Sequence, residues 1–136
     1  MKEYKFEDLY IGLKASFKIK ITEEMMKGFE IMTGDINPLH INQEYAKEKG
    51  MLDKVVYGML TSSFYSTLVG VYLPGKRCLL QGIEIFFKKP VYIGEEIEIY
   101  GEISYLNETY KIAEIKAYIK NESKKISTAK ITVGVI

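Results

Sequence analysis

The sequence contains a single histidine, His40, five positions after Asp35. Histidine has an unperturbed pKa near neutrality, so a histidine beside a carboxylate can exchange protons with a substrate or a water molecule. On a continuous α-helix the two side chains would lie about 140° apart, on different faces. Pro38 lacks an N–H and restricts the residue before it, which argues against such a helix. We therefore expect residues 33–40 to form a compact loop, either an ordinary turn or a proton-transfer site.

Helices are predicted on both sides of this loop. Thr22 can cap a helix whose first turn carries two glutamates, because acidic side chains are favourable at a helix N-terminus. Gly34 suits the left-handed position that ends this helix. Asn42 can cap a short second helix over residues 43–49. The loop is therefore expected to connect two helices.

The longest predicted helix covers residues 58–72 and carries no charge on any face, so we expect other structure to surround it. No Ser, Thr, Asp or Asn immediately precedes Gly58, and the first N–H groups therefore lack a local cap. Such free N–H groups, with the positive end of the helix dipole, can stabilise an anion. The alternative is that Gly58 serves only close packing.

Ser62 and Ser66 lie four residues apart on the same face of this helix. One of them could bond to the loop of Asp35 and orient its carboxylate. The alternative is that both hydroxyls bond to the backbone carbonyl one turn earlier.

Most of the remaining chain reads as β-strands. The predicted strands cover residues 15–21, 78–88, 95–106, 110–120 and 125–135. Because four long strands follow one another, we predict an α+β fold in which a curved antiparallel sheet wraps around the uncharged helix. The edges of that sheet could pair across a dimer. Along the last strand, one predicted face comprises Ile126, Thr128, Lys130 and Thr132, and the other Ala129, Ile131, Val133 and Val135.

The composition is that of an ordinary globular chain: of 136 residues, 47% are hydrophobic and 27% charged, with a net charge of +1. This length favours a single domain over residues 1–136. The scattered charges indicate no nucleic-acid partner, and no segment suits a signal peptide or a membrane span. The lone cysteine, Cys78, fits a cytoplasmic location. With one His and one Cys, we expect no metal site and no cofactor.

The chain resembles, over nearly its full length, the MaoC-like or R-specific enoyl-thioester hydratase branch of the hot-dog fold. The most specific shared element is Gly-Asp-x-Asn-Pro-x-His over residues 34–40. Phe-x-x-Pro-Val-x-x-Gly over residues 87–94 is weaker alone. Further matching elements lie at residues 6–9, 21–25 and 58–60, and their order and separation strengthen the assignment.

The resemblance implies a homodimer, able to associate further, with an acyl-thioester tunnel between its subunits. It implies Asp35 and His40 as the catalytic pair and the N–H of Gly58 as the donor to an oxyanion. A serine near the position of Ser66 has a supporting place in this family. Many relatives carry His where this chain has Tyr57, a departure that concerns the shape of the pocket.

The implied reaction is the reversible hydration of a trans-2-enoyl thioester to an (R)-3-hydroxyacyl thioester, carried by coenzyme A or by an acyl carrier protein. Asp35 and His40 could hold one water between them, while Asn37 braces the loop through side-chain-to-backbone bonds. Either residue could be the base. The alternatives are a hot-dog acyl-CoA thioesterase and a non-catalytic acyl-thioester binding module.

Overall fold

The computed structural model describes residues 1–122 and 124–136. Within these residues, five strands form one antiparallel sheet in the order β1-β3-β4-β5-β2. The strands are β1 (Lys14–Lys20), β2 (Cys78–Phe87), β3 (Glu96–Asn107), β4 (Ile112–Asn121) and β5 (Lys124–Val135). Strands β3, β4 and β5 are sequential neighbours, whereas β2 pairs with β5 rather than with β3, so the four long strands do not follow one another across the sheet as predicted.

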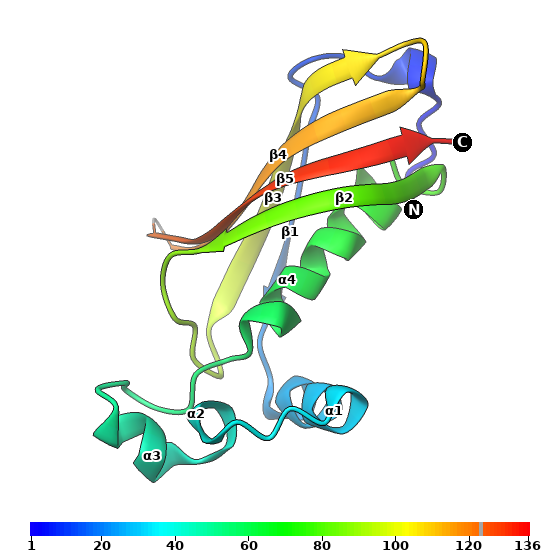
Figure 1. Ribbon diagram of the computed structural model, residues 1–136. Coiled ribbons are helices and arrows are strands. Elements are labelled where there is room, and N and C mark those ends of the chain that lie inside the picture. The colour runs from blue at the N-terminus through cyan, green and yellow to red at the C-terminus, as the bar shows by residue number, and fades with distance from the viewer. Residues whose placement is uncertain (123) are drawn as a thin grey trace.

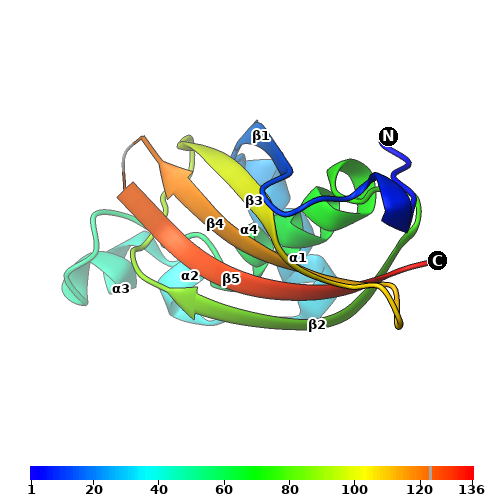
Figure 2. The same ribbon diagram turned by 90° about the horizontal axis from the view of Figure 1, so that it is seen from above.

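The α-helices come between β1 and β2 in the chain. They are α1 (Glu23–Thr33), α2 (Pro38–Ile41), α3 (Gln43–Glu48) and α4 (Gly58–Thr67), with a π-helical turn over Leu68–Tyr72 extending α4. Figure 1 shows α4 running beneath the sheet, with α1, α2 and α3 gathered near its first turn. Figure 2 shows the curvature of the strands over α4. The predicted curved sheet around an uncharged helix is confirmed.

The core lies between the sheet and α4. Along β4 and along β3 as far as Ile103, every second residue is buried, as expected for a sheet with one face on the core. Isoleucines from these strands, among them Ile99 and Ile115, are fully buried and pack in one cluster with Leu60 and Leu68. This apolar interface fixes the position of α4, and therefore of its first turn, relative to the sheet.

The predicted face of Ile126 is wrong. Thr128 and Lys130 are indeed less buried than Ala129 and Ile131, but the side chain of Ile126 is buried. The pairing of β4 with β5 shifts register beside Ile126, which has no strand partner among the described residues. Because side chains alternate between faces, an irregularity of one residue moves a side chain to the opposite face.

The predicted helix ends are confirmed around α1 and α3. The side chain of Thr22 accepts a hydrogen bond from the N–H of Met25, and Gly34 ends α1 with a φ of 73°. Asn42 caps α3 in the same way as Thr22 caps α1. These caps fix both ends of the segment that carries Asp35 and His40.

The extent of the predicted loop is wrong, because His40 lies on the short helix α2. Pro38 is the first residue of α2, where its missing N–H leaves no helical bond unmade. Asn37 precedes it as the N-cap, and its side chain accepts a hydrogen bond from the N–H of Leu39. The non-helical part of the segment is therefore confined to residues 34–37.

The two edges of the sheet differ in chemistry. The exposed side chains of β1 are mainly lysines, which discourage pairing with another strand. The other edge strand, β2, exposes apolar side chains: Leu79, Leu80, Ile83, Phe86 and Phe87. Among the described residues, no helix combines the length and the apolar character that crossing a membrane requires.

Candidate active site

Asp35 is held in a short hydrogen-bonded segment after α1. Its N–H donates to Oγ1 of Thr33 over 3.2 Å, and its Oδ1 accepts the N–H of Asn37 over 3.0 Å. Oγ1 of Thr33 in turn donates to the carbonyl oxygen of Phe29 over 2.7 Å. These bonds orient the carboxylate through Oδ1 and leave Oδ2 available to another group.

His40 is oriented by the chain that leads into α4. Its Nδ1 lies 2.7 Å from the carbonyl oxygen of Val55. A carbonyl can only accept, so Nδ1 carries the hydrogen in this bond. In the neutral ring Nε2 then holds the free lone pair, and it is the atom able to exchange a proton with a ligand.

The first turn of α4 presents unused N–H groups. Tyr57 is its N-cap, and no side chain in the described part of the chain caps the helix with a hydrogen bond. The carbonyl oxygen of Tyr57 accepts the N–H groups of Leu60 and Thr61, whereas no acceptor among the described residues bonds to the N–H of Gly58. A Cβ at Gly58 would lie 2.8 Å from the ring of Phe87, so a larger residue requires that ring to move.

Asp35, His40 and Gly58 line one cavity of about 620 Å³. Other lining residues supply a mainly apolar wall: Phe29, Thr33, Tyr57, Met59 and Phe87. The cavity therefore combines a carboxylate, an imidazole and a helix N-terminus with space for an apolar group. This is the combination that acid–base chemistry beside a developing oxyanion requires.

A known protein family matches most of this chain. Residues 11–127 match the model of the MaoC like domain. The chain belongs to the MaoC-like family. The matched region includes α1, the Asp35 segment, α4 and most of the sheet, and it therefore covers both halves of the cavity.

Curated relatives of this MaoC-like chain are hydratases and dehydratases of thioesters. The (R)-specific enoyl-CoA hydratase of Aeromonas caviae is 32% identical over 113 residues, which cover 83% of this chain and 84% of that protein. The 3-hydroxybutyryl-CoA dehydratase of Methylorubrum extorquens is 32% identical over 101 residues, covering 74% and 64% respectively.

Solved structures confirm the fold. The (R)-hydratase from A. caviae matches with a TM-score of 0.91 at 29% identity, over 96% of this chain and 99% of that one. An R-hydratase from Pseudomonas aeruginosa matches with a TM-score of 0.89 at 22% identity, over 96% of this chain and 84% of that one. The predicted hot-dog fold is thus confirmed for the MaoC-like chain.

The supporting serines differ in burial, although they lie one turn apart on α4. Ser62 is buried, and its hydroxyl has no hydrogen-bond partner among the described residues. Ser66 is exposed, on the same uncharged stripe as Met59 and Ser63. Within the single described chain, neither serine bonds to Asp35.

Tyr57 makes the contact with the Asp35 segment that was expected of a serine. Its hydroxyl donates to the carbonyl oxygen of Asp35 over 2.6 Å. The sequence marks Tyr57 only as a residue beside Gly58 that can shape the pocket. Nothing in the spacing of positions 35 and 57 indicates that the two residues touch.

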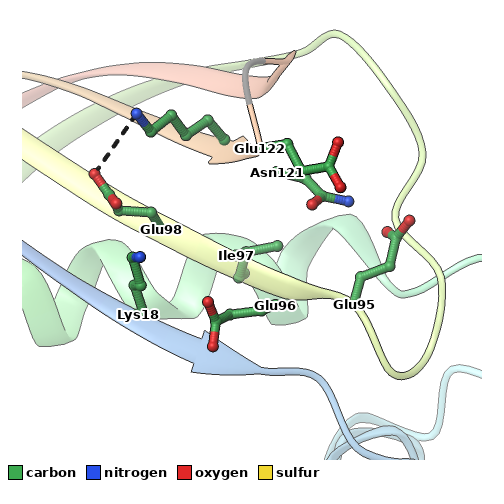
Figure 3. Close-up of a pocket in the computed structure, with 8 residues that line it drawn as sticks. Lys18, Glu95, Glu96, Ile97, Glu98, Asn121 and Glu122 are labelled. Carbon is green, nitrogen blue, oxygen red and sulfur yellow. Dashed lines mark ion pairs between the residues drawn. The ribbon is translucent and has the colours of Figure 1, made fainter.

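A second cavity, of about 520 Å³, opens beside the start of β3 and the ends of β1 and β4 (Figure 3). Its lining is mainly acidic and shares no residue with the Asp35 cavity: Lys18, Glu95, Glu96, Ile97, Glu98, Lys120, Asn121 and Glu122. Lys120 pairs with Glu98 over 3.8 Å. Such charged walls do not suit an apolar group, so the Asp35 cavity is the better candidate active site of the two.

Proposed function

We propose that this chain catalyses the reversible hydration of a trans-2-enoyl thioester to the (R)-3-hydroxyacyl thioester. The observation that carries this proposal is the convergence of Asp35, His40 and the N-terminus of α4 on one cavity. Hydration requires a base for water, an acid for Cα and a donor for the thioester oxygen. The three groups correspond to these three requirements.

The Asp35–His40 pair performs the proton transfers. A water bound between Nε2 of His40 and Oδ2 of Asp35 gives up a proton to the pair as its oxygen bonds to Cβ. The electrons of the C=C bond move toward the thioester carbonyl, and an enolate forms. The pair then returns a proton to Cα, which completes the addition of water and restores both side chains.

The N–H of Gly58 stabilises the enolate. As negative charge develops on the thioester oxygen, this N–H donates a hydrogen bond, and the positive end of the α4 dipole adds to the effect. Glycine allows the oxygen to approach the backbone closely. The ring of Phe87 lies beside Gly58 and adds apolar surface to the cavity wall there.

The relatives support the substrate class and the configuration of the product. The A. caviae relative is named an (R)-specific enoyl-CoA hydratase, and the M. extorquens relative a 3-hydroxybutyryl-CoA dehydratase. Another relative, from Solanum lycopersicum, is named a 3-hydroxyacyl-[acyl-carrier-protein] dehydratase. We therefore include both coenzyme A and carrier-protein thioesters in the proposal.

The active form is proposed to be a homodimer assembled through β2. This edge exposes apolar side chains that a second copy would cover, whereas lysines protect the β1 edge. The exposed face of α4, which includes Met59 and Ser66, is uncharged as well. Because Met59 and Phe87 also line the Asp35 cavity, the partner would complete the cavity wall.

The test is a product-resolved assay on enoyl thioesters of increasing chain length, linked to coenzyme A and to a carrier protein. The expected result is loss of the conjugated enoyl absorbance with formation of the (R)-3-hydroxyacyl product. Free thiol without a hydroxyacyl product would instead identify a thioesterase. Tight acyl-CoA binding without turnover would identify a binding module.

A further inference from the structure

Tyr57 connects the three parts of the candidate site. It is buried, with 2% of its surface exposed, and it immediately precedes Gly58. Its hydroxyl donates to the carbonyl oxygen of Asp35 over 2.6 Å, and its ring stacks on the imidazole of His40 at 4.2 Å between centroids. The ring of Phe29 on α1 also packs against the Tyr57 ring, at 4.7 Å between centroids.

The hydrogen bond from the Tyr57 hydroxyl joins the Asp35 segment to a distant part of the chain. Every other hydrogen bond that residues 34–37 make within the described chain joins residues no more than four apart. These local bonds shape the segment but do not fix it relative to α4. The Tyr57 hydroxyl does so, because it is attached to the residue that caps α4.

The hydroxyl is suited to act as a permanent donor. Burial raises the pKa of Tyr57, and the nearby carboxylates of Asp35 and Glu30 raise it further. The phenol therefore keeps its proton at neutral and mildly alkaline pH. A carbonyl oxygen can only accept, so the bond to Asp35 depends on that proton.

We infer that Tyr57 is a positioning residue, which holds the Asp35 backbone and the His40 ring at the separation needed to bind one water. This inference rests on the proposed hydratase function. Tyr57 acts through Asp35 and His40 rather than on the substrate itself. The role requires the tyrosine hydroxyl, because phenylalanine would keep the ring contacts but lose the hydrogen bond to the carbonyl oxygen of Asp35.

The same helix offers a matched control. Tyr65 on α4 is also buried, with 1% of its surface exposed, and its hydroxyl pairs with Oγ of Ser127 over 2.8 Å. Tyr65 does not line the Asp35 cavity. Tyr57→Phe and Tyr65→Phe therefore each delete one hydroxyl from a buried tyrosine of the same region, but only the first deletes a bond to the site.

The first experiment compares kcat, KM and melting temperature for the wild type, Y57F and Y65F on a short enoyl-CoA. We expect Y57F to lower kcat about 10- to 100-fold, because small misplacements of catalytic groups cost this much, with KM changed less than about threefold. Y65F should keep kcat within about twofold. An unchanged kcat in Y57F, an equal loss in Y65F, or a Y57F protein that does not fold would overturn the inference.

The second experiment places Y57F in the Asp35→Asn background. If Tyr57 acts through Asp35, the double variant should be about as active as D35N alone, whereas independent roles predict multiplied losses. Failure of the proposed function is distinguishable, because the wild-type chain would then hydrate no enoyl thioester. Wild-type activity with multiplied losses would overturn the positioning role alone.

Discussion

Asp35 and His40 owe their orientation to backbone groups rather than to each other. The carboxylate accepts the N–H of Asn37, and the imidazole donates from Nδ1 to the carbonyl oxygen of Val55. Each side chain therefore keeps one atom for chemistry, Oδ2 on the first and Nε2 on the second. Two groups oriented independently in this way can share one water without competing for the same hydrogen bond.

Single substitutions of Asp35 and His40 can remove the proton-transfer group and keep the hydrogen bond to the backbone. In Asp35→Asn the amide oxygen can still accept from Asn37, and in His40→Asn the amide can still donate to Val55. We expect each variant to lose at least about 10²-fold in the initial rate of hydration, measured spectrophotometrically, because each lacks a proton-transfer group. The melting temperature should change little. Retained activity in either variant would exclude that residue from the proton transfers.

At the scale of elements, the first turn of α4 decides whether an oxyanion can be stabilised. Tyr57 has a φ of −54° and a ψ of 124°, which are values compatible with a following proline. Gly58 is the first residue of α4, where proline is well tolerated. The N–H of Gly58 can therefore be deleted without breaking the helix.

Gly58→Pro should lower kcat by about 10²–10³-fold, the usual cost of losing one oxyanion donor. Gly58→Ala is the control, because it introduces the same contact with Phe87 but retains the N–H. Steady-state kinetics of the two variants separate the effects of crowding and of the lost donor. Equal losses in G58A and G58P would show that crowding, not the missing N–H, lowers the rate.

The attachment of α4 to β5 depends on a buried hydrogen bond between Tyr65 and Ser127. Burial raises the pKa of Tyr65 to about 12, from a usual value of 10. Between these values the folded chain binds the phenolic proton and the unfolded chain does not. The contribution of Tyr65 to stability is therefore complete below pH 10 and is lost as pH rises toward 12.

Tyr65→Phe should lower the free energy of unfolding by about 1 kcal/mol at pH 8, the usual net value of one hydrogen bond. The difference in free energy of unfolding between Y65F and the wild type should become smaller above pH 10, because folding of the wild type then requires Tyr65 to keep its proton. Urea denaturation of both proteins at pH 8, 10 and 11 measures this. A difference that stays constant with pH would contradict the role assigned to the Tyr65 proton.

At the scale of the whole molecule, the most informative feature is the exposed apolar and uncharged surface beside the Asp35 cavity. The apolar edge of β2 and the uncharged stripe of α4 expose side chains that a water-facing surface would not favour. Both surfaces adjoin the Asp35 cavity through Phe87 and Met59. Assembly and activity are therefore expected to be coupled.

Ile83→Glu places a charge in the middle of the β2 edge and should convert the proposed dimer to a monomer, with a parallel loss of hydratase activity. Tyr110→Glu is the control, because Tyr110 is also an exposed apolar residue but lies in the turn between β3 and β4. Light scattering after size-exclusion chromatography reports the mass. A wild-type monomer, or an active I83E monomer, would contradict the proposed assembly.

The sequence by itself determined the features that depend on neighbouring residues. The caps of α1 and α3, the start of α4 and the approximate extents of the strands follow from local hydrogen bonding and side-chain periodicity. The candidate groups Asp35, His40 and Gly58 were predicted as well, from their chemistry and from the family motif. The reversal of Ile126 was not, because a register irregularity arises between two strands.

Only the tertiary structure decided which distant groups meet. Val55 selects the protonated nitrogen of His40, and Tyr57 rather than a serine holds the Asp35 segment. Ser66 faces outward because α4 leaves one uncharged stripe uncovered. Positions far apart in the chain are brought together by packing over the whole core, and no local pattern of residues records that outcome.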